Sequence, residues 1–496
     1  MGGVWLSGAE GSSWASPRPA DGRGLAGGPE ARGRRGRRPG GAGEMEPKLG
    51  FHELLHVFSF LEARDLLRAA QVDKVWNEVS RTKELWRHLC LRRWSSCTAS
   101  QMTVGTQTWK EYYLCRSELE FRMERGRPEK DFICKAIAGH TAEIDGLAYI
   151  SSNLCRFDGQ AKSTVCTVSW DCTLRAWDMQ EGTEIWSSLP QPAALVNVVA
   201  LPRLQLAVTV DKRGLIKVWG AEDGRERASF FLPVLSSALQ ACDHPEGPFL
   251  LVACAEGFLF VLTVPQLQLR SRTPVFPGSP ARLLCSPGCQ WVFAWTQSSE
   301  LGPKVFHTRS LLCPEEDEPP VSATLPACLT CIACWAPDET ARLMVTHRND
   351  NDLQLVVTTY ELGVQQSREG ADVMVQQVAH FLLPNTRMPP HLMKGHGSQV
   401  ILLVSWLELA LFTIHGVQLA AFQDHQRPIA SLWVDQNLVV TASFDLSLRV
   451  YVWSKEEKLP ALKSCYYLLG GSHRWARRCW DLTLDINLEA MRSWWL

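Results

Sequence analysis

The sequence predicts a mainly β protein that carries an N-terminal α-helical module. Residues 49–90 repeat large apolar side chains at helical spacing, whereas from about residue 131 short β-rich runs alternate with Gly, Pro and Asp. The chain has 496 residues, of which 46% are hydrophobic. We therefore expect more than one domain, with enough apolar side chains for a sizeable core.

The composition excludes several classes of protein. The net charge of −1 argues against binding to nucleic acid or to an anionic membrane through the whole chain. The 17 cysteines are scattered without a small-domain framework, and the N-terminal residues lack the apolar core of a secretory signal. We expect reduced thiols and a cytoplasmic and/or nuclear location.

Residues 1–44 are rich in Gly, Arg, Pro and Ser, which predicts a disordered tail. The Arg-rich stretch 32–41 would suit nuclear import or nucleic-acid binding. A solvated tail is the favoured alternative, as is a translation start at Met45. We therefore expect no nucleic-acid partner.

The helical module spans residues 45–90. Its first apolar stripe has the spacing i, i+3, i+4, i+7, and shorter stripes follow around Leu66, Trp76 and Trp86. We expect Asp65 and Asp73 to be helix N-caps. Some forty residues cannot bury so many large apolar side chains alone. They either dock on the rest of the chain or offer a surface to another protein.

This module resembles an F-box. The matching residues are Leu49, Glu53-Leu54-Leu55, Ser59-Phe60-Leu61, Asp65-Leu66-Leu67, Val72, Trp76 and Leu85-Trp86-Arg87-Leu89. The chain departs from the pattern at Gly50, where Pro is usual, and at Asp73, where Cys is common. The resemblance implies docking to a Skp-type adaptor and, through it, to a cullin and a RING subunit. The implied adaptor-binding residues are Leu54, Leu55, Phe58, Leu61, Leu66, Leu67, Val72, Trp76 and Trp86. The alternative is an ordinary helical subdomain.

Residues 91–130 are expected to form a helical linker. Trp109, Tyr112 and Tyr113 have helical spacing, and Thr106 or Thr108 could cap the helix. The stretch lacks the Gly and Ser of a flexible tether. We expect it to hold the module at a fixed distance and angle from the β-rich region.

Residues 131–462 contain many short strands, which predicts a closed all-β architecture. Two units, Gly139-His140 to Trp177-Asp178 and Asp424-His425 to Tyr451, resemble WD repeats, and the motif is degenerate between them. At roughly 40–45 residues per repeat we expect a propeller of about seven blades. The resemblance implies a structural network within these two blades, made of His140, Ser169 (or Thr167), Asp171 and Trp177, and of His425, Ser443, Asp445 and Tyr451. Strand 135–138 would complete the last blade.

The propeller would carry the target-binding face. In the resembling family the residue before the turn Asp lies on the ligand-facing rim, and here these residues are Trp170 and Phe444. Aromatic side chains there suit a protein or peptide ligand. Alternatively, they cover neighbouring blades. Residues 463–496, rich in Trp and Arg, are either a final strand or a frayed end.

Other stretches that could suggest a membrane span or a metal site have simpler structural explanations. Residues 400–422 are apolar enough to cross a membrane, but Glu408 and a turn at His415-Gly416 favour two buried strands, so we expect no membrane partner. Cys328, Cys331 and Cys334 lack the further ligands of an iron–sulfur or zinc site. We find no set of residues for catalysis, and expect neither a metal nor a cofactor.

Together the module and the blades resemble F-box/WD-repeat proteins, and the stretches EGTEIWSS, GPFLLV and FQDHQ resemble the subgroup numbered twelve. The resemblance implies a non-catalytic substrate-recognition subunit of an SCF-type (Skp–cullin–F-box) E3 ubiquitin ligase, with an unknown target protein on the propeller. The alternative is a WD-repeat scaffold that mediates protein–protein interaction outside any ligase.

Overall fold

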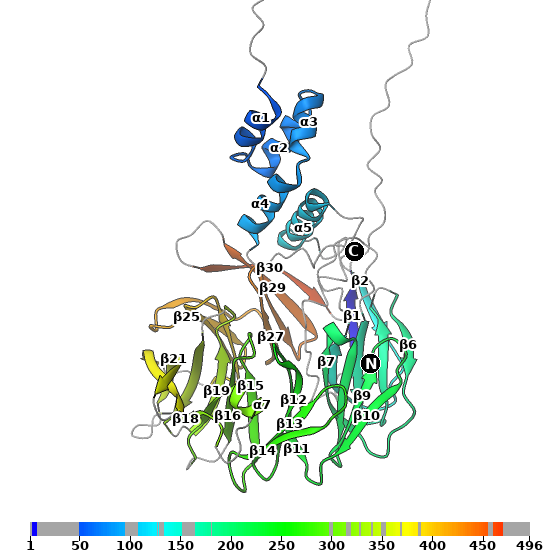
Figure 1. Ribbon diagram of the computed structural model, residues 1–496, viewed down its shortest axis with the longest axis vertical. Helices are drawn as coiled ribbons and strands as arrows, with labels where there is room; N and C mark the ends of the chain where they lie inside the picture. Colours follow the sequence, from blue (N-terminus) through cyan, green and yellow to red (C-terminus); the bar gives the residue numbers. More distant parts are fainter. Residues whose placement is uncertain are drawn as a thin grey trace, which may run out of the picture. The chain divides into compact units, whose positions relative to one another are not determined.

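The structure is a computed structural model of the full chain (Figure 1). It describes residues 2–6, 49–94, 108–125, 127, 133–150, 164–179, 181–296, 301–313, 319–326, 329–338, 341–348, 354–367, 370–384, 388–454 and 460–469. The chain forms two compact units, one of residues 9–116 and one of residues 1–8 with 117–496. The first contains the helical module and the second contains the β-sheets.

The module is built from four short helices, α1 (Phe51–Phe58), α2 (Ala63–Ala69), α3 (Lys74–Ser80) and α4 (Lys83–Arg93). Asp73 caps α3 as expected, because its Oδ1 accepts a hydrogen bond from the Trp76 backbone N–H at 2.8 Å. The expectation for Asp65 is wrong. The good helix formers Ala63 and Arg64 start α2 earlier, so Asp65 lies in its first turn.

A fifth helix, α5 (Trp109–Glu124), begins with a capping box. The Thr108 backbone N–H donates to Glu111 Oε2 at 2.8 Å, and the Glu111 N–H donates to Thr108 Oγ1 at 3.2 Å. The first two turns of α5 complete the core of the module. Buried Arg116 places its guanidinium 4.5 Å from the centroid of the Trp94 ring and donates to the Tyr112 hydroxyl at 2.9 Å.

The second unit contains seven antiparallel four-stranded sheets, which confirms a mainly β fold with a seven-bladed propeller. The first three blades are β3 (Ile144–Tyr149), β4 (Thr164–Ser169), β5 (Leu174–Asp178) and β6 (Thr183–Ser187); β7 (Leu195–Leu201), β8 (Leu206–Asp211), β9 (Leu215–Gly220) and β10 (Glu226–Phe231); and β11 (Ser236–His244), β12 (Gly247–Cys254), β13 (Phe258–Thr263) and β14 (Leu269–Pro274).

The other four blades are β15 (Ala281–Cys285), β16 (Trp291–Thr296), β17 (Lys304–His307) and β18 (Ser322–Thr324); β19 (Leu329–Trp335), β20 (Arg342–Arg348), β21 (Leu355–Ser367) and β22 (Gly370–Leu382); β23 (Leu392–His396), β24 (Val400–Ser405), β25 (Glu408–Thr413) and β26 (Gln418–Phe422); and β27 (Ile429–Val434), β28 (Leu438–Ser443), β29 (Ser447–Ser454) and β30 (Ala461–Leu469). Short helices η2 (Pro202–Leu204) and α7 (Thr308–Leu312) lie in connections.

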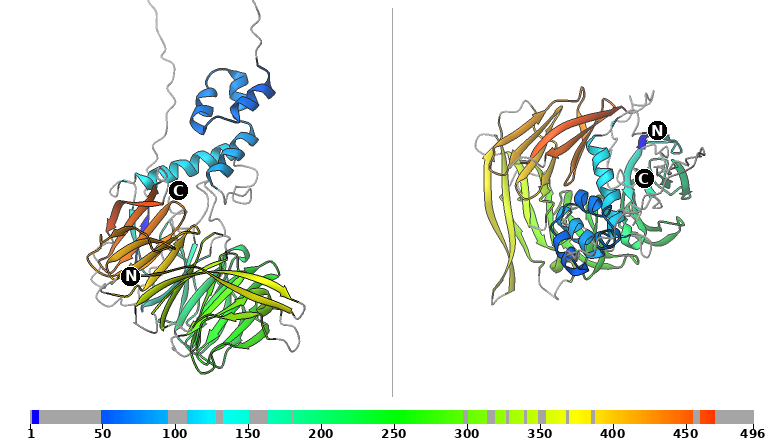
Figure 2. Two further views of the ribbon diagram at one scale, coloured as in Figure 1. Left: turned by 90° about the vertical axis from the view of Figure 1, so that its left-hand side faces the viewer. Right: turned by 90° about the horizontal axis from the view of Figure 1, so that it is seen from above.

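The blades follow one another around a ring in chain order, with the first strand of each blade innermost (Figure 2). Clusters of buried apolar side chains lie between consecutive blades from the first to the seventh, which explains the continuous apolar runs. In β12, Leu250 and Val252 pack with the second blade, whereas Leu251 and Ala253 pack with the fourth. Alternate side chains of one strand thus serve two cores.

Residues 135–138 do not complete the last blade, contrary to expectation. The fourth strand of that blade is β30, which runs past residue 462 to Leu469. The segment instead forms β2 (Ile133–Ile137) and pairs antiparallel with β1 (Gly2–Leu6). Residues 2–6 therefore differ from the disorder expected for residues 1–44. Pairing with β2 satisfies the backbone groups of a segment that has no core of its own. Residues 7–48 and 470–496 lie outside the described part of the chain.

The apolar stretch 400–422 forms three strands rather than two. The expected turn at His415-Gly416 separates β25 from β26, but a second turn at Trp406-Leu407 separates β24 from β25. Trp406 adopts φ +59°, a conformation that the sequence rule assigns to Gly or Asn, so the turn was missed. Among the helices that the structure describes, none is long and apolar enough to span a membrane.

Candidate functional site

The adaptor-binding residues inferred from the sequence divide into two groups in the module. Leu54, Phe58, Leu66 and Trp86 are buried within it. The Trp86 indole N–H donates to the Ser80 carbonyl oxygen at 2.6 Å, and the ring meets Tyr113 edge-on at 5.5 Å. Phe58 packs edge-on against Trp76 at 5.3 Å. The four buried side chains therefore hold the helices together and have little surface for a partner.

The remaining residues of that set lie at the surface. Leu55, Leu61, Leu67 and Trp76 are half-buried, and Val72 is 61% exposed. Further exposed apolar side chains in the first three helices and their connections are Leu49, Phe51, Val57, Phe60 and Val75. Phe60, at 73%, is the most exposed of them. A helical stripe misses Phe60 because α1 ends at Phe58, although the S-F-L motif of the resemblance contains it.

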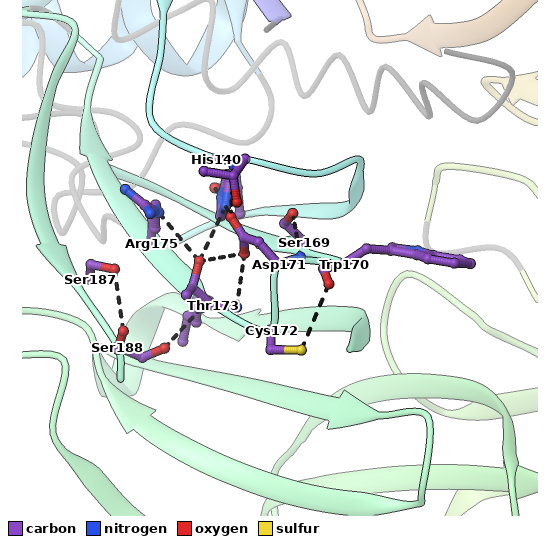
Figure 3. Close-up of polar contacts among 12 residues, drawn as sticks. His140, Ser169, Trp170, Asp171, Cys172, Thr173, Arg175, Ser187 and Ser188 are labelled. Carbon is purple, nitrogen blue, oxygen red and sulfur yellow. Dashed lines mark hydrogen bonds and ion pairs between the residues drawn. The ribbon is translucent and has the colours of Figure 1, made fainter. Parts of the chain in front are cut away.

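In the first blade the structure brings the four motif side chains into one chain of hydrogen bonds, part of which is drawn in Figure 3. The Trp177 indole N–H donates to Thr167 Oγ1 at 2.7 Å. Thr167 Oγ1 lies 2.7 Å from His140 Nε2, and His140 Nδ1 lies 2.9 Å from Asp171 Oδ2. Since Asp171 only accepts, His140 carries its proton on Nδ1, and Thr167 donates to Nε2. The relay hydroxyl is Thr167, the second of the two candidates.

Asp171 organises the turn between β4 and β5. Its Oδ1 accepts from the Thr173 hydroxyl at 2.6 Å and from the Thr173 N–H at 3.0 Å, while its Oδ2 accepts from the Thr141 N–H at 3.0 Å. Ser169 Oγ accepts from the Asp171 N–H at 3.1 Å, so Ser169 supports the turn rather than the relay (Figure 3). Asp171 thus ties the turn to the segment at Thr141 that precedes β3.

The titration of this pair follows from burial and hydrogen bonding. Burial lowers the pKa of His140 more than Asp171 raises it, which keeps the imidazole neutral. Burial alone would raise the pKa of Asp171, but the bonds from Thr173, His140 and Thr141 outweigh it and lower the pKa to about 2. The polar groups of this network bond to one another, so we assign it a structural role within the blade.

The last blade repeats the network with two changes that compensate for each other, Tyr451 in place of Trp177 and Asp424 in place of Gly139. His425 lies 3.1 Å from Asp445 through Nδ1 and 2.8 Å from Thr441 Oγ1 through Nε2. Buried Tyr451 stands where the first blade has Trp177. The first blade needs Gly139 before its His, because a Cβ there would lie 2.4 Å from Cη2 of Trp177. The shorter Tyr451 removes that conflict, and the last blade has Asp424 in the corresponding place.

The remaining predicted residue of this blade, Ser443, lies outside the relay. Its Oγ donates to the Arg427 carbonyl oxygen at 2.8 Å and accepts from the Asp445 N–H at 3.1 Å. Ser447 takes the role of Thr173, since its hydroxyl donates to Asp445 Oδ1 at 2.5 Å. Burial raises the pKa of the Tyr451 hydroxyl. The first and last blades therefore share one hydrogen-bond network. The sequence motif predicted its residues, except that it did not single out the Thr hydroxyl that bonds the His ring.

The candidate target residues lie on the turns that follow the second strand of a blade. Trp170 is 46% exposed in the first blade and Phe444 is 39% exposed in the seventh. Trp406, at 50%, occupies the corresponding turn of the sixth blade, next to the seventh along the ring. We call these three side chains the aromatic rim. Sequence reasoning missed Trp406 because no motif surrounds it, although an exposed Trp between two apolar runs is itself a signal.

Trp170 is held in place from two sides. Its indole N–H donates to Asp145 Oδ2 at 2.9 Å, and the ammonium of Lys212 lies 3.1 Å from the ring centroid. Lys212 occupies in the second blade the turn position that Trp170 occupies in the first. The ring thus covers part of a neighbouring blade and still keeps an exposed face.

A family model described as F-box-like matches residues 53–92. F-box/WD repeat-containing protein 12 of Homo sapiens is 35% identical over 424 residues, which cover 86% of this chain and 91% of that protein. This chain belongs to the F-box/WD-repeat family. The match also supports the subgroup numbered twelve. F-box/WD repeat-containing protein 15 of Mus musculus is 31% identical over 416 residues, or 84% of this F-box/WD-repeat chain and 89% of the relative.

Among solved structures, Hsv2 of Kluyveromyces lactis superposes with a TM-score of 0.46 at 10% identity, over 66% of this chain and 98% of Hsv2. A likeness at that level adds nothing on function.

In the part of the chain that the structure describes, no group of three or more His, Cys, Asp or Glu is placed to hold a metal ion. Cys334 is buried, and burial raises its pKa to about 12. Cys328 lies outside the described residues, so the C-x2-C-x2-C stretch as a set is not tested.

Proposed function

We propose that this F-box/WD-repeat protein is the substrate-recognition subunit of an SCF-type E3 ubiquitin ligase. The observation that carries the proposal is the F-box-like match at residues 53–92 on the same chain as a seven-bladed propeller. The module would dock a Skp-type adaptor and, through it, a cullin and a RING subunit. The propeller would hold the target protein.

The adaptor would meet the exposed apolar side chains rather than the buried ones. Phe60 and Val72 are the most exposed large apolar residues of the module, and burying such side chains supplies most of the free energy of a protein interface. Half-buried Leu55, Leu61 and Trp76 would extend the contact. Leu54, Phe58, Leu66 and Trp86 would contribute indirectly, by holding the helices in place.

The target would meet the aromatic rim. Phe444 and Trp406 come from consecutive blades, and Trp170 occupies the same turn position in the first blade. Exposed aromatic side chains are frequent hot spots for protein ligands. In this account the chain does no chemistry. It raises the concentration of target lysines near the ubiquitin thioester, which accelerates transfer by proximity. A cytoplasmic and/or nuclear location follows from the proposal.

Affinity purification of the tagged chain with mass spectrometry tests this function. Phe60→Ala with Val72→Ala should remove the adaptor and cullin but keep target proteins, whereas Trp170→Ala with Phe444→Ala should do the reverse. Phe231→Ala with Val417→Ala is the matched control, because both residues are exposed apolar side chains on the propeller. Wild-type chain that captures partners but neither adaptor nor cullin would favour the scaffold alternative.

A further inference from the structure

The hairpin of the fifth blade is longer than the rest of that blade. β21 and β22 have 13 residues each and form the long yellow pair of strands in Figure 2. The pairing of β21 with β20 ends at Glu361, whereas its pairing with β22 continues to Ser367. Residues 362–367 and 370–375 therefore form a two-stranded ribbon that extends past β20.

One face of this ribbon is anchored on the neighbouring blade. Leu362 is buried, and Val373 and Val375 pack with it in an apolar cluster. The same cluster contains Val305 in β17 and Leu325 directly after β18, both from the fourth blade. Since a two-stranded hairpin alone is only marginally stable in water, these contacts hold the ribbon in place.

The outer edge of β22 is open. β22 is the last strand of its sheet, and none of the strands that the structure describes pairs with its outer side. Proteins usually block such edges with charged side chains, Pro or short strands. The outer strands β10 and β14 carry Arg227, Arg270 and Arg272, whereas β18 and β26 are short. β22 contains no Lys, Arg or Pro and has one carboxylate, at Asp372. It therefore presents a long edge without the usual protection.

Met374 lies near the middle of the ribbon part of this edge. It is 51% exposed, because Gly363 stands opposite it in β21 and offers no side chain. Asp372 and Gln376, two residues away on either side, are also exposed and share its face of the strand. A large apolar side chain thus lies exposed between a hydrogen-bond acceptor and an amide that can donate.

We propose that a second copy of this chain pairs antiparallel with β22 to form a two-fold dimer, in which Met374 faces its own counterpart. A strand centred there complements itself, since Asp372 of each copy lies opposite Gln376 of the other, and Val373 lies opposite Val375. Centring the pair on Asp372 would instead bring two carboxylates together. The two sheets would become one continuous sheet, and the backbone groups of both open edges would gain hydrogen bonds.

Sedimentation velocity of the purified full-length chain over a range of concentrations tests the dimer. We expect wild type to associate, and Met374→Lys to weaken the association about tenfold or more, because the two introduced ammonium groups face each other. Met388→Lys is the matched control, since Met388 is also an exposed methionine but lies outside the fifth blade, and it should associate like wild type. The proposal is overturned if wild type stays monomeric, which would leave the edge to a segment of another protein, or if Met374→Lys associates as tightly as wild type.

Charge reversal separates a broken interface from a misfolded chain. Met374→Glu alone should be as monomeric as Met374→Lys, but an equimolar mixture of the two should form a heterodimer, because each Lys then faces a Glu. A mixture that stays monomeric would also overturn the proposal. Neither measurement uses the adaptor, so the outcome is independent of the proposed ligase function.

Discussion

The helical module and the propeller differ in how well sequence spacing separates residues that build the fold from residues that face outward. In the propeller, the motif side chains His140, Asp171 and Trp177 belong to an internal network, and the neighbouring Trp170 is exposed. In the module, one apolar stripe contains both buried Leu54 and half-buried Leu55. The side chains of a strand alternate between two faces, so position alone assigns a direction. An amphipathic stripe on a short helix does not tell whether it faces its own core or a partner.

The largest effect should come from a matched pair of phenylalanines in the module. Phe58→Ala removes a fully buried ring that packs on Trp76 and should cost about 3–5 kcal/mol of stability. Phe60→Ala, two residues later and largely exposed, should change stability by no more than about 0.5 kcal/mol. Chemical denaturation followed by circular dichroism at the helical band measures both. Equal losses would mean that Phe60 belongs to the core.

A matched pair of tryptophans makes the same comparison in the propeller. Trp177→Ala removes a buried ring and leaves the Thr167 hydroxyl without its donor, which should cost about 3–5 kcal/mol. Trp170→Ala should cost roughly 1 kcal/mol, because it loses the bond to Asp145 and the contact with Lys212 at an exposed site. Thermal unfolding of the two variants gives the difference. A Trp170 variant as unstable as the Trp177 variant would assign Trp170 to blade packing instead of the rim.

The pH dependence of stability should show the terminal-blade networks. The pKa values of His140 and His425 are lowered from 6.5, so their stabilisation is present above pH 6.5 and is lost as the pH falls through their folded-state values. Asp171, lowered from 3.8 to about 2, stabilises above pH 3.8, and this contribution is lost as the pH falls towards 2. Unfolding temperatures of wild type and Asp171→Asn across this range check the second window. A variant with the wild-type profile below pH 3.8 would contradict the role of Asp171.

The sequence predicted the architecture because strand alternation, turn residues and a repeat period all point to a propeller. It located the first and last blades through His140 and His425. It left Ser169 or Thr167 open in the first blade, where Thr167 forms the relay, and chose Ser443 in the last, where Thr441 does. Which hydroxyl reaches the imidazole depends on strand register, which the spacing of the motif leaves open by two residues. The sequence analysis placed residues 135–138 in the last blade, because the residue pattern of that strand does not distinguish it from β30.

The proposed docking face could be inferred from sequence only in part. Helical spacing selected Leu55 and Leu61, but the ends of α1 and α2 decide that Phe60 and Val72 lie in connections and point outward. Trp406 and Lys212 could not be found from motifs, because they belong to degenerate blades. Trp406 joins the aromatic rim, and Lys212 meets the Trp170 ring, through the arrangement of the blades in the fold.

The central claim is that the exposed apolar side chains of the module dock a Skp-type adaptor. The direct measurement is the affinity of a purified adaptor for the full-length wild-type chain, for Phe60→Ala with Val72→Ala, and for the control Phe231→Ala with Val417→Ala. We expect tight binding by wild type and control, and binding roughly thirtyfold or more weaker by the module variant, with its helical content unchanged. Equal affinity of all three chains, or no binding by wild type, would contradict the account.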